Sequence, residues 1–284
     1  MGISNAARQR RRKRIHSSDL ACILNISPWA NATDIYFEKA FKSEKEPPET
    51  DYQRLGNRFE GAILDEMKFR LGLPKIKKNP RTIIHADNIN GSNIDATVPD
   101  NPRVHLEAKL VGLLHYSREL MDEWGEDGTD EIPDHVNIQV HHQMAVYGSE
   151  ACYVGALLAG RGMRIYRIER NDELCNALLM TARDFWTEHV LKKIQPDGVP
   201  SLDHVRYLTR KERTSVQIKP AWVGEFYREA SAVRLAAFKA EDRAKAALLA
   251  ALGDCDEGLM PGGMFTYYAN KRGARTLRWK EDQP

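Results

Sequence analysis

The chain of 284 residues has 42% hydrophobic and 29% charged side chains, which is ordinary for a soluble globular protein of one large or two small domains. It has no run of about 18 apolar residues and no apolar core of a secretory signal, so we expect neither a membrane helix nor export. Its net charge of +2 requires any nucleic-acid surface to gather its basic residues locally, and its four scattered cysteines argue against an iron–sulfur cluster or a zinc ribbon.

A basic segment comes first, because six of the seven residues 8–14 are arginine or lysine. Such a run indicates either a solvated arm or an arm that binds phosphate. A short helix is expected next, with Ser17 or Ser18 as its N-cap and its end before Pro28. Asn31 then caps a second helix.

A long amphipathic helix is predicted from Asp51 to Leu71 by the spacing of its apolar residues. Its predicted buried stripe repeats at every fourth position and consists of Leu55, Phe59, Ile63 and Met67. Glu60 lies at the edge of this stripe. It is either a surface glutamate near the boundary or an acid directed at the same site as Asp95, further along the chain.

Two strand-like segments, RTIIHA and SNIDATV, lead to the stretch around which the chain is organised, VHLEAKL at residues 104–110. Apolar and polar residues alternate in it, so Glu107 and Lys109 must point to the same side of a strand. Asp95 precedes them across the turn VPDNP, as in a hairpin. An aspartate followed by Glu-x-Lys on the next strand can bind a divalent metal and orient a water, which suits phosphodiester hydrolysis. The alternative is a surface ion pair between Glu107 and Lys109.

The next helix begins at the segment PDHV and closes at Gly148, with Gln139 and Gln143 on one face. The continuous apolar run ACYVGALLA predicts a strand buried on both faces, and MRIYRIER its antiparallel neighbour. A helix capped by Asn171 is expected to run to about Ile194.

The segment QPDGVPS marks a composition boundary, after which a long charged helix is predicted from Lys219 to Leu252. The last segment, MFTYYANKRGARTLRWK, has the pattern of a hairpin in which aromatic and basic residues are interleaved. It is either an ordinary hairpin with a solvated basic tip or a surface that follows a DNA backbone.

These segments, in this order, resemble the core of the PD-(D/E)xK nucleases and, more narrowly, the YqaJ-like viral recombinase and lambda exonuclease family. The resemblance covers residues 11–194 through the motifs SSDLACILNISPW, LGNRFEGAILDEM, NIDATV, LEAKL, IQVHHQMAVYG and RIYRIERNDEL. It implies an α/β fold with a mixed central sheet flanked by helices. A basic arm at 1–14 would precede the nuclease core at 15–196, and a helical and hairpin extension would occupy 197–284.

The resemblance also implies a magnesium site, which manganese would be able to fill as well. Asp95 and Glu107 would hold the ion with the backbone carbonyl of Ala108, and Glu60 would complete the site. Lys109 would position or deprotonate the attacking water, because a nearby metal and burial both lower the pKa of a lysine.

Four further residues receive roles from the same resemblance. Gln139 would orient the metal ligands or the attacking water. Arg11, Arg14 and Ser18 fall in the region where the family binds the terminal 5′ phosphate. Arginine suits that role because its planar guanidinium pairs with phosphate in a bidentate manner.

The implied activity is that of a magnesium-dependent 5′-to-3′ exonuclease, which acts on duplex DNA with a free end and leaves 3′ single strands for phage-type recombination. The implied setting is the cytoplasm of a bacterial host, with a single-strand annealing protein as partner and a homo-oligomer, a ring-shaped trimer, as the assembly. Three alternatives remain. They are an endonuclease of the same fold, an iron–sulfur nuclease whose cysteine spacing this chain lacks, and an inactive DNA-binding accessory protein. The last is suggested by Asn93-Ile94-Asp95-Ala96, where the family usually has Ser-Pro-Asp-Gly.

Overall fold

The computed structural model describes residues 11–41, 49–78, 81–113, 121–205 and 214–282. By its internal contacts the chain divides into two units, residues 1–210 and 211–284. The first unit contains the central sheet and the candidate site, and the second contains a long helix and a small sheet. The division falls later in the chain than the predicted boundary at 196, which stays a prediction.

A five-stranded mixed sheet forms the centre of the first unit, in the order β2-β5-β6-β7-β8. The strands β6 and β7 are parallel, and every other neighbouring pair is antiparallel. The predicted α/β fold with a mixed sheet is therefore confirmed. The strands span Lys77–Lys78 (β2), Ala96–Thr97 (β5), Val104–Val111 (β6), Ala151–Leu158 (β7) and Gly162–Glu169 (β8).

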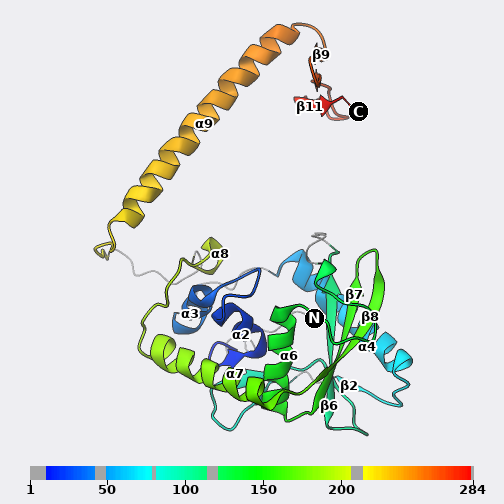
Figure 1. Cartoon of the computed structure of the whole chain (residues 1–284). Coiled ribbons are helices and arrows are strands. Elements are labelled where there is room, and N and C mark those ends of the chain that lie inside the picture. The colour runs from blue at the N-terminus through cyan, green and yellow to red at the C-terminus, as the bar shows by residue number, and fades with distance from the viewer. Residues whose placement is uncertain (1–10, 42–48, 79–80, 114–120, 206–213, 283–284) are drawn as a thin grey trace. The chain divides into compact units, whose positions relative to one another are not determined.

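Helices cover both faces of this sheet (Figure 1). The helix α4 packs on one face, where Ile63, Leu64 and Met67 meet Leu106. On this face Gly155 of β7 leaves room for α4, since a Cβ there would lie 2.4 Å from Met67 Sδ. The other face carries α6, and α2 and α7 pack on α6 in turn. The helices span Ser17–Ile23 (α2), Ala32–Ala40 (α3), Asp51–Arg70 (α4), Asp134–Tyr147 (α6) and Asp172–Phe185 (α7).

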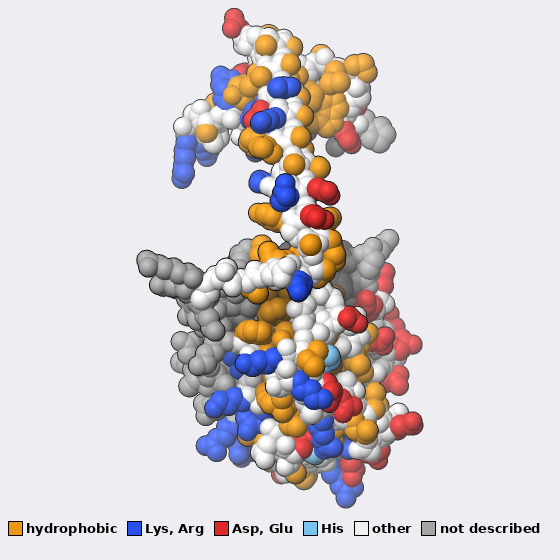
Figure 2. Space-filling model, turned by 90° about the vertical axis from the view of Figure 1, so that its left-hand side faces the viewer, with side chains coloured by type: hydrophobic (Ala, Val, Ile, Leu, Met, Phe, Trp, Pro, Cys, Tyr) orange, Lys and Arg blue, Asp and Glu red, His pale blue; other side chains and the backbone are white. Residues whose placement is uncertain are grey.

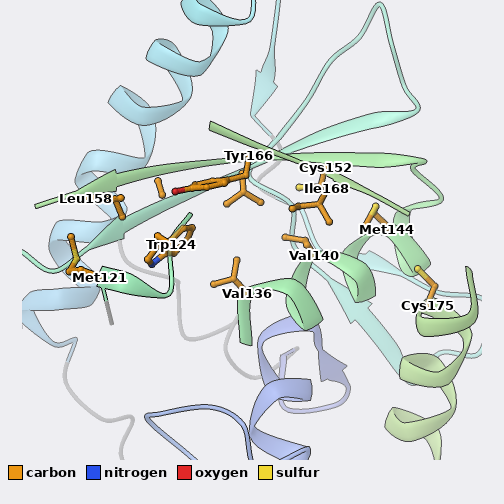
Figure 3. Close-up of a cluster of buried hydrophobic side chains, with 12 residues drawn as sticks. Met121, Trp124, Val136, Val140, Met144, Cys152, Leu158, Tyr166, Ile168 and Cys175 are labelled. Carbon is orange, nitrogen blue, oxygen red and sulfur yellow. The ribbon is translucent and has the colours of Figure 1, made fainter. Parts of the chain in front are cut away.

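The core between α6 and the sheet fixes the height of α6 above the strands. Val136, Val140 and Met144 point from α6 toward Tyr166 and Ile168 of β8 (Figure 3). The predicted end of this helix is confirmed, because Gly148 takes the left-handed conformation with a φ of 87°. Burial of these apolar side chains stabilises the contact by roughly 1.5–3 kcal/mol for each fully buried side chain.

The predicted helix at 51–71 is confirmed as α4, but its predicted buried stripe is only half right. Ile63 and Met67 are buried, whereas Phe59 is 37% exposed and Leu55 is half-buried. Leu64 takes a buried place that the four-residue spacing did not include. The periodicity marked the apolar side of the helix, but the tertiary packing decides which residues on that side are covered.

The predicted strand SNIDATV is wrong as a single strand. Its first part belongs to β4 (Asn90–Ser92), which pairs with β1 (Ile15–His16) and β3 (Ile83–Ile84) in a separate three-stranded sheet. Its last part forms β5 of the central sheet, and Asp95 lies between the two. The predicted hairpin is confirmed, since Ala96 of β5 pairs with Leu106 of β6.

The helix predicted after the basic segment is confirmed as α2, but its N-cap is His16 rather than Ser17 or Ser18. The His16 backbone N–H donates to Asp19 Oδ2 at 2.9 Å, so the side chain of Asp19 serves the helix start. The end of α2 at Ile23 precedes Pro28 as expected. Asn31 caps α3 as predicted, because its side chain accepts from the Asp34 backbone N–H.

After Asn171, whose side chain caps α7 as predicted, the helix changes at Trp186 into a π-helical segment that ends at Leu191. A short helix, α8, spans Leu202–Val205. Among the described residues, no helix has both the length and the apolar character needed to cross a membrane.

The second unit begins its regular structure with α9 (Trp222–Leu252), which confirms the predicted long charged helix. The predicted hairpin is present as the antiparallel pair β10 (Gly263–Thr266) and β11 (Arg278–Glu281). A third strand that the sequence reading missed, β9 (Glu257–Met260), completes the sheet on the other side of β10. Leu252, at the end of α9, packs against Gly258 of β9. A Cβ at Gly258 would lie 2.7 Å from the Leu252 side chain.

Candidate functional site

The carboxylate of Glu107 is the centre of a buried polar cluster between β6 and α6. Glu107 is only 3% exposed, yet both oxygens of its carboxylate accept hydrogen bonds. Lys109 Nζ donates to Glu107 Oε1 at 2.7 Å, and Gln139 Nε2 donates to the same oxygen at 2.6 Å. Gln143 Nε2 donates to Glu107 Oε2 at 2.8 Å. A buried charge is tolerated when it is paired and hydrogen-bonded in this way.

The periodicities of the two elements bring these four side chains together. Glu107 and Lys109 are two residues apart on a strand and point to the face that α6 covers. Gln139 and Gln143 are four residues apart on α6 and lie on one side of it. Gln139 also accepts a hydrogen bond from Lys109 Nζ at 2.9 Å, so its amide bridges the acid and the amine.

Asp95 lies beside this cluster, just before the first residue of β5. Its Oδ2 accepts a hydrogen bond from the backbone N–H of Ala108 at 2.8 Å. The pKa of Asp95 is raised well above its ordinary range, because burial and the nearby carboxylate of Glu107 both disfavour its charged form. Two of the predicted metal ligands are thus close enough to interact strongly.

Glu60 approaches the cluster from α4. Its pKa is raised, first by burial and then by the charge of Glu107, and its own charge contributes to the raised pKa of Asp95. Within the described part of the chain, no hydrogen bond joins Glu60 to Asp95 or Glu107. The structure therefore brings Glu60 into the electrostatic range of the two acids without direct contact.

The donor set suits a hard divalent cation. Among the described residues, no group of three or more His, Cys, Asp or Glu side chains is placed to hold a metal ion. Two carboxylates with a backbone carbonyl are nevertheless the kind of set that binds Mg²⁺, which keeps several of its waters. The mutual repulsion of Asp95 and Glu107 fits such an ion, because a cation between them would favour the charged forms of both.

The pKa of Lys109 differs from the sequence-based expectation. Burial by itself would lower this pKa, as we expected, but the charge of Glu107 and its hydrogen bond to Lys109 outweigh burial and raise it. Lys109 is consequently a charged ammonium in this structure. The alternative of a surface ion pair is also wrong in one respect, because its Glu107 partner is buried rather than exposed.

Arg11 and Ser18 lie together at the start of α2, as the prediction for a phosphate site requires. Arg11 Nη2 donates to Ser18 Oγ at 2.5 Å and to Asp19 Oδ1 at 3.1 Å. Arg14 does not join this contact, but its Nε is buried and has no hydrogen-bond partner in the described region. Arg8 and Arg10 of the predicted basic arm lie outside the described residues.

A second set of polar contacts, which the sequence reading missed, ties α2 to α6. Ser17 Oγ lies 2.9 Å from His142 Nδ1, and His142 Nε2 lies 2.7 Å from Asn90 Oδ1. His142 directly precedes Gln143, so the same turn of α6 contacts both α2 and Glu107. No local sequence signal identified His142, since its partners are distant along the chain.

His105 and Gln143 were also missed as site residues. His105 Nε2 lies 3.2 Å from Gln143 Oε1, and His105 Nδ1 lies 2.8 Å from Ser149 Oγ. The strand alternation that puts Glu107 and Lys109 on one side puts His105 there too, so a signal was present. Gln143 shares the helix face of Gln139, which was the corresponding signal for it.

Asp19 anchors the region that contains Arg11. Lys39 Nζ, which is fully buried, lies 2.8 Å from Asp19 Oδ2. Burial by itself would raise the pKa of Asp19, but the charges of Lys39 and Arg11 hold that pKa well below its ordinary value. The position of Arg11 thus depends on a buried ionic cluster.

Replacement of Asp19 by Asn should destabilise the protein by about 3–5 kcal/mol, because it removes the buried carboxylate that pairs with both Lys39 and Arg11 and leaves the buried ammonium of Lys39 with Glu38 alone. The control Asp51→Asn breaks an exposed ion pair with Arg54 and should cost less than about 1 kcal/mol. Chemical denaturation measures both. Since the folded-state pKa of Asp19 is lowered, its contribution is complete above the ordinary pKa of 3.8 and is lost as the pH falls below it. Equal losses in the two variants would contradict the anchoring role.

The sequence profile of the YqaJ-like viral recombinase domain matches residues 8–150, which include every predicted site residue. The uncharacterized protein YqaJ of Bacillus subtilis is 26% identical over 184 residues, which are 64% of this chain and 54% of that protein. The chain thus matches about half the length of this curated relative.

Two solved exonuclease structures also resemble the chain. An alkaline exonuclease, LHK-Exo, from Laribacter hongkongensis is 15% identical, with a TM-score of 0.48, over 63% of this chain and 89% of that one. A phage-related exonuclease from Haemophilus somnus 129PT is 13% identical, with a TM-score of 0.44, over 64% of this chain and 96% of that one.

Proposed function

The chain belongs to the YqaJ-like viral recombinase family, and we propose that it is a metal-dependent deoxyribonuclease that digests linear duplex DNA from its ends. One observation carries the proposal. The buried glutamate and the lysine of the Glu-x-Lys strand share one hydrogen-bonded cluster, and an aspartate held by the backbone N–H between them lies beside it. A structural ion pair would not require a second acid beside it, and the pKa of this second acid, Asp95, is raised by burial and then by the charge of Glu107.

Asp95, Glu107 and the Ala108 carbonyl would hold a magnesium ion, or manganese in its place, and Glu60 would complete the site. When bound, the ion polarises the phosphoryl oxygen and lowers the pKa of a coordinated water. Gln139 keeps the Glu107 carboxylate in its orientation through the 2.6 Å hydrogen bond. Lys109 would hold the attacking water or the phosphate with the same ammonium that now contacts Glu107.

The polarity of digestion would come from the start of α2. Arg11 and Ser18 supply a guanidinium and a hydroxyl that can bind a terminal 5′ phosphate, and the unpaired Nε of Arg14 supplies a further donor. Binding of that end would make the reaction 5′-to-3′ and leave 3′ single strands for recombination. A single-strand annealing protein would receive these strands. The reaction would take place in the cytoplasm of a bacterial host, and the enzyme would act as a trimer.

An inactive DNA-binding accessory protein is the second candidate. It is favoured by the sequence around Asp95, where Asn93-Ile94 and Ala96 replace the proline and glycine usual in the family. Tight binding of duplex DNA without cleavage in magnesium or manganese would support it.

The variants Lys109→Ala and Glu107→Gln should each slow digestion of end-labelled linear duplex by about 10²-fold or more, because they remove the group that handles the water or a metal ligand. The control Glu150→Gln alters an exposed glutamate of a surface ion pair and should leave the rate unchanged. EDTA should abolish digestion by the wild type.

Digestion that persists in Lys109→Ala would show that the site is misidentified. Wild-type protein that leaves linear duplex intact in magnesium and in manganese would contradict the nuclease proposal altogether. Equal attack on closed circular duplex would replace the exonuclease with the endonuclease alternative.

The wild type should digest 5′-phosphorylated duplex faster than 5′-hydroxyl duplex, and Arg11→Lys should reduce this preference. Lysine keeps the positive charge beside Asp19 but loses the bidentate geometry that suits phosphate. Arg103→Lys, at an exposed surface ion pair, is the matched control. An equal loss of rate on both substrates would contradict a role of Arg11 in recognising the 5′ phosphate.

A further inference from the structure

The long helix α9 presents an apolar surface that the rest of its own unit does not cover. Of its 31 residues, the buried one is Leu252 at the C-terminal end. Val223, Phe226 and Val233 are 43%, 66% and 70% exposed. Figure 2 shows apolar side chains along the face of α9 that is turned toward the viewer. Long helices owe most of their stability to packing of such a surface, so this one requires a partner.

The apolar residues of α9 follow a heptad repeat. When Val223 is assigned to position a, every a and d position as far as residue 251 is apolar, over four heptads. A repeat of this length, with a spacing of about 3.5 residues, is the pattern of a coiled coil. The positions a and d, here called the α9 seam, are occupied by Val223, Phe226, Ala230, Val233, Ala237, Ala240, Ala244, Ala247 and Ala251.

The order of large and small residues along the α9 seam distinguishes the two ways in which a pair of helices can run. In a parallel pair, Phe226 would face Phe226 while the alanine positions would face alanine. The side chains at the contact set the separation of two packed helices. The two α9 helices would therefore need to lie far apart at one end and close together at the other. A parallel pair of α9 helices is therefore poorly packed.

In an antiparallel pair, position a of one helix faces position d of the other. The register that centres on residue 235 places Val223 against Ala247 and Phe226 against Ala244 of the second helix. The same register places Val233 against Ala237. Every large residue of the seam then meets an alanine, which gives layers of similar volume along the pair.

The charges that flank the α9 seam agree with this register. Glu229 and Arg243 occupy the same flanking position, and the antiparallel register brings Glu229 of each helix beside Arg243 of the other. The contact occurs twice by symmetry. Arg234 lies near Arg234 of the second helix in this register. The aliphatic part of its side chain can stay at the interface while its charged end reaches solvent.

We propose that α9 is the dimerisation element of this protein and pairs antiparallel with α9 of a second copy. The contacts are the α9 seam and the two Glu229–Arg243 pairs. The proposal is independent of the nuclease assignment, because it rests on residues of the second unit alone.

Phe226→Glu should halve the mass of the full-length protein measured by sedimentation or light scattering, since it puts a charge into the α9 seam. Phe238→Glu is the matched control, because Phe238 is 60% exposed on the same helix but lies off the seam, and it should leave the mass unchanged. Glutamate is a good helix former, so circular dichroism should show both variants as helical as the wild type. In the proposed trimer, the same factor of two applies between a hexamer of the wild type and a trimer of the variant.

Disulfide formation tests the direction of the pair. The exposed Cys255 is first replaced by serine, and the other three cysteines are buried. In this background, Ala230→Cys mixed with Ala240→Cys should give a cross-linked heterodimer, whereas Ala230→Cys alone should give none. Cross-linking of Ala230→Cys with itself would show a parallel pair. A wild type with the same mass as Phe226→Glu would overturn the proposal, and so would a partner that is not a copy of this chain.

Discussion

A single buried charge, the carboxylate of Glu107, sets the geometry of the first unit. Its three hydrogen-bond donors come from β6 and from α6, so the helix can neither slide nor rotate on the sheet without exposing an unpaired charge to a low dielectric. The apolar contacts of Val140 and Met144 hold α6 at the right height, and the polar contacts fix its rotation. Packing and electrostatics thus specify the same arrangement.

The helix α6 connects the two clusters from which the proposed chemistry is built. One side of it holds Glu107 through Gln139 and Gln143, and another holds α2 through the contact between His142 and Ser17. The distance between the acids and the start of α2 is therefore set by one rigid element. An enzyme that measures from a chain end to the bond it breaks needs such a fixed spacing.

Local patterns predicted the elements whose causes are local. Three such patterns are the alternation in VHLEAKL, the cap at Asn31 and the glycine at 148. Each specifies a conformation within a few residues, and the structure contains each conformation. The division of SNIDATV between two sheets could not be predicted, because it depends on β1 pairing with residues far along the chain. The exposure of Phe59 could not be predicted from the periodicity of its helix, because it depends on tertiary packing against α4. The same holds for the site, since the Glu-x-Lys spacing indicated Lys109 but nothing local indicated His142.

The ion pair between Lys109 and Glu107 implies that the site carries its own counter-ion. A divalent cation bound as proposed would have to compete with an ammonium that lies 2.7 Å from one oxygen of Glu107. Binding of a metal would then be an exchange of one positive charge for another, in which the buried carboxylate of Glu107 stays compensated. In the proposed metal site, the Lys109 ammonium would be free to leave Glu107 once a cation took over its role as counter-ion.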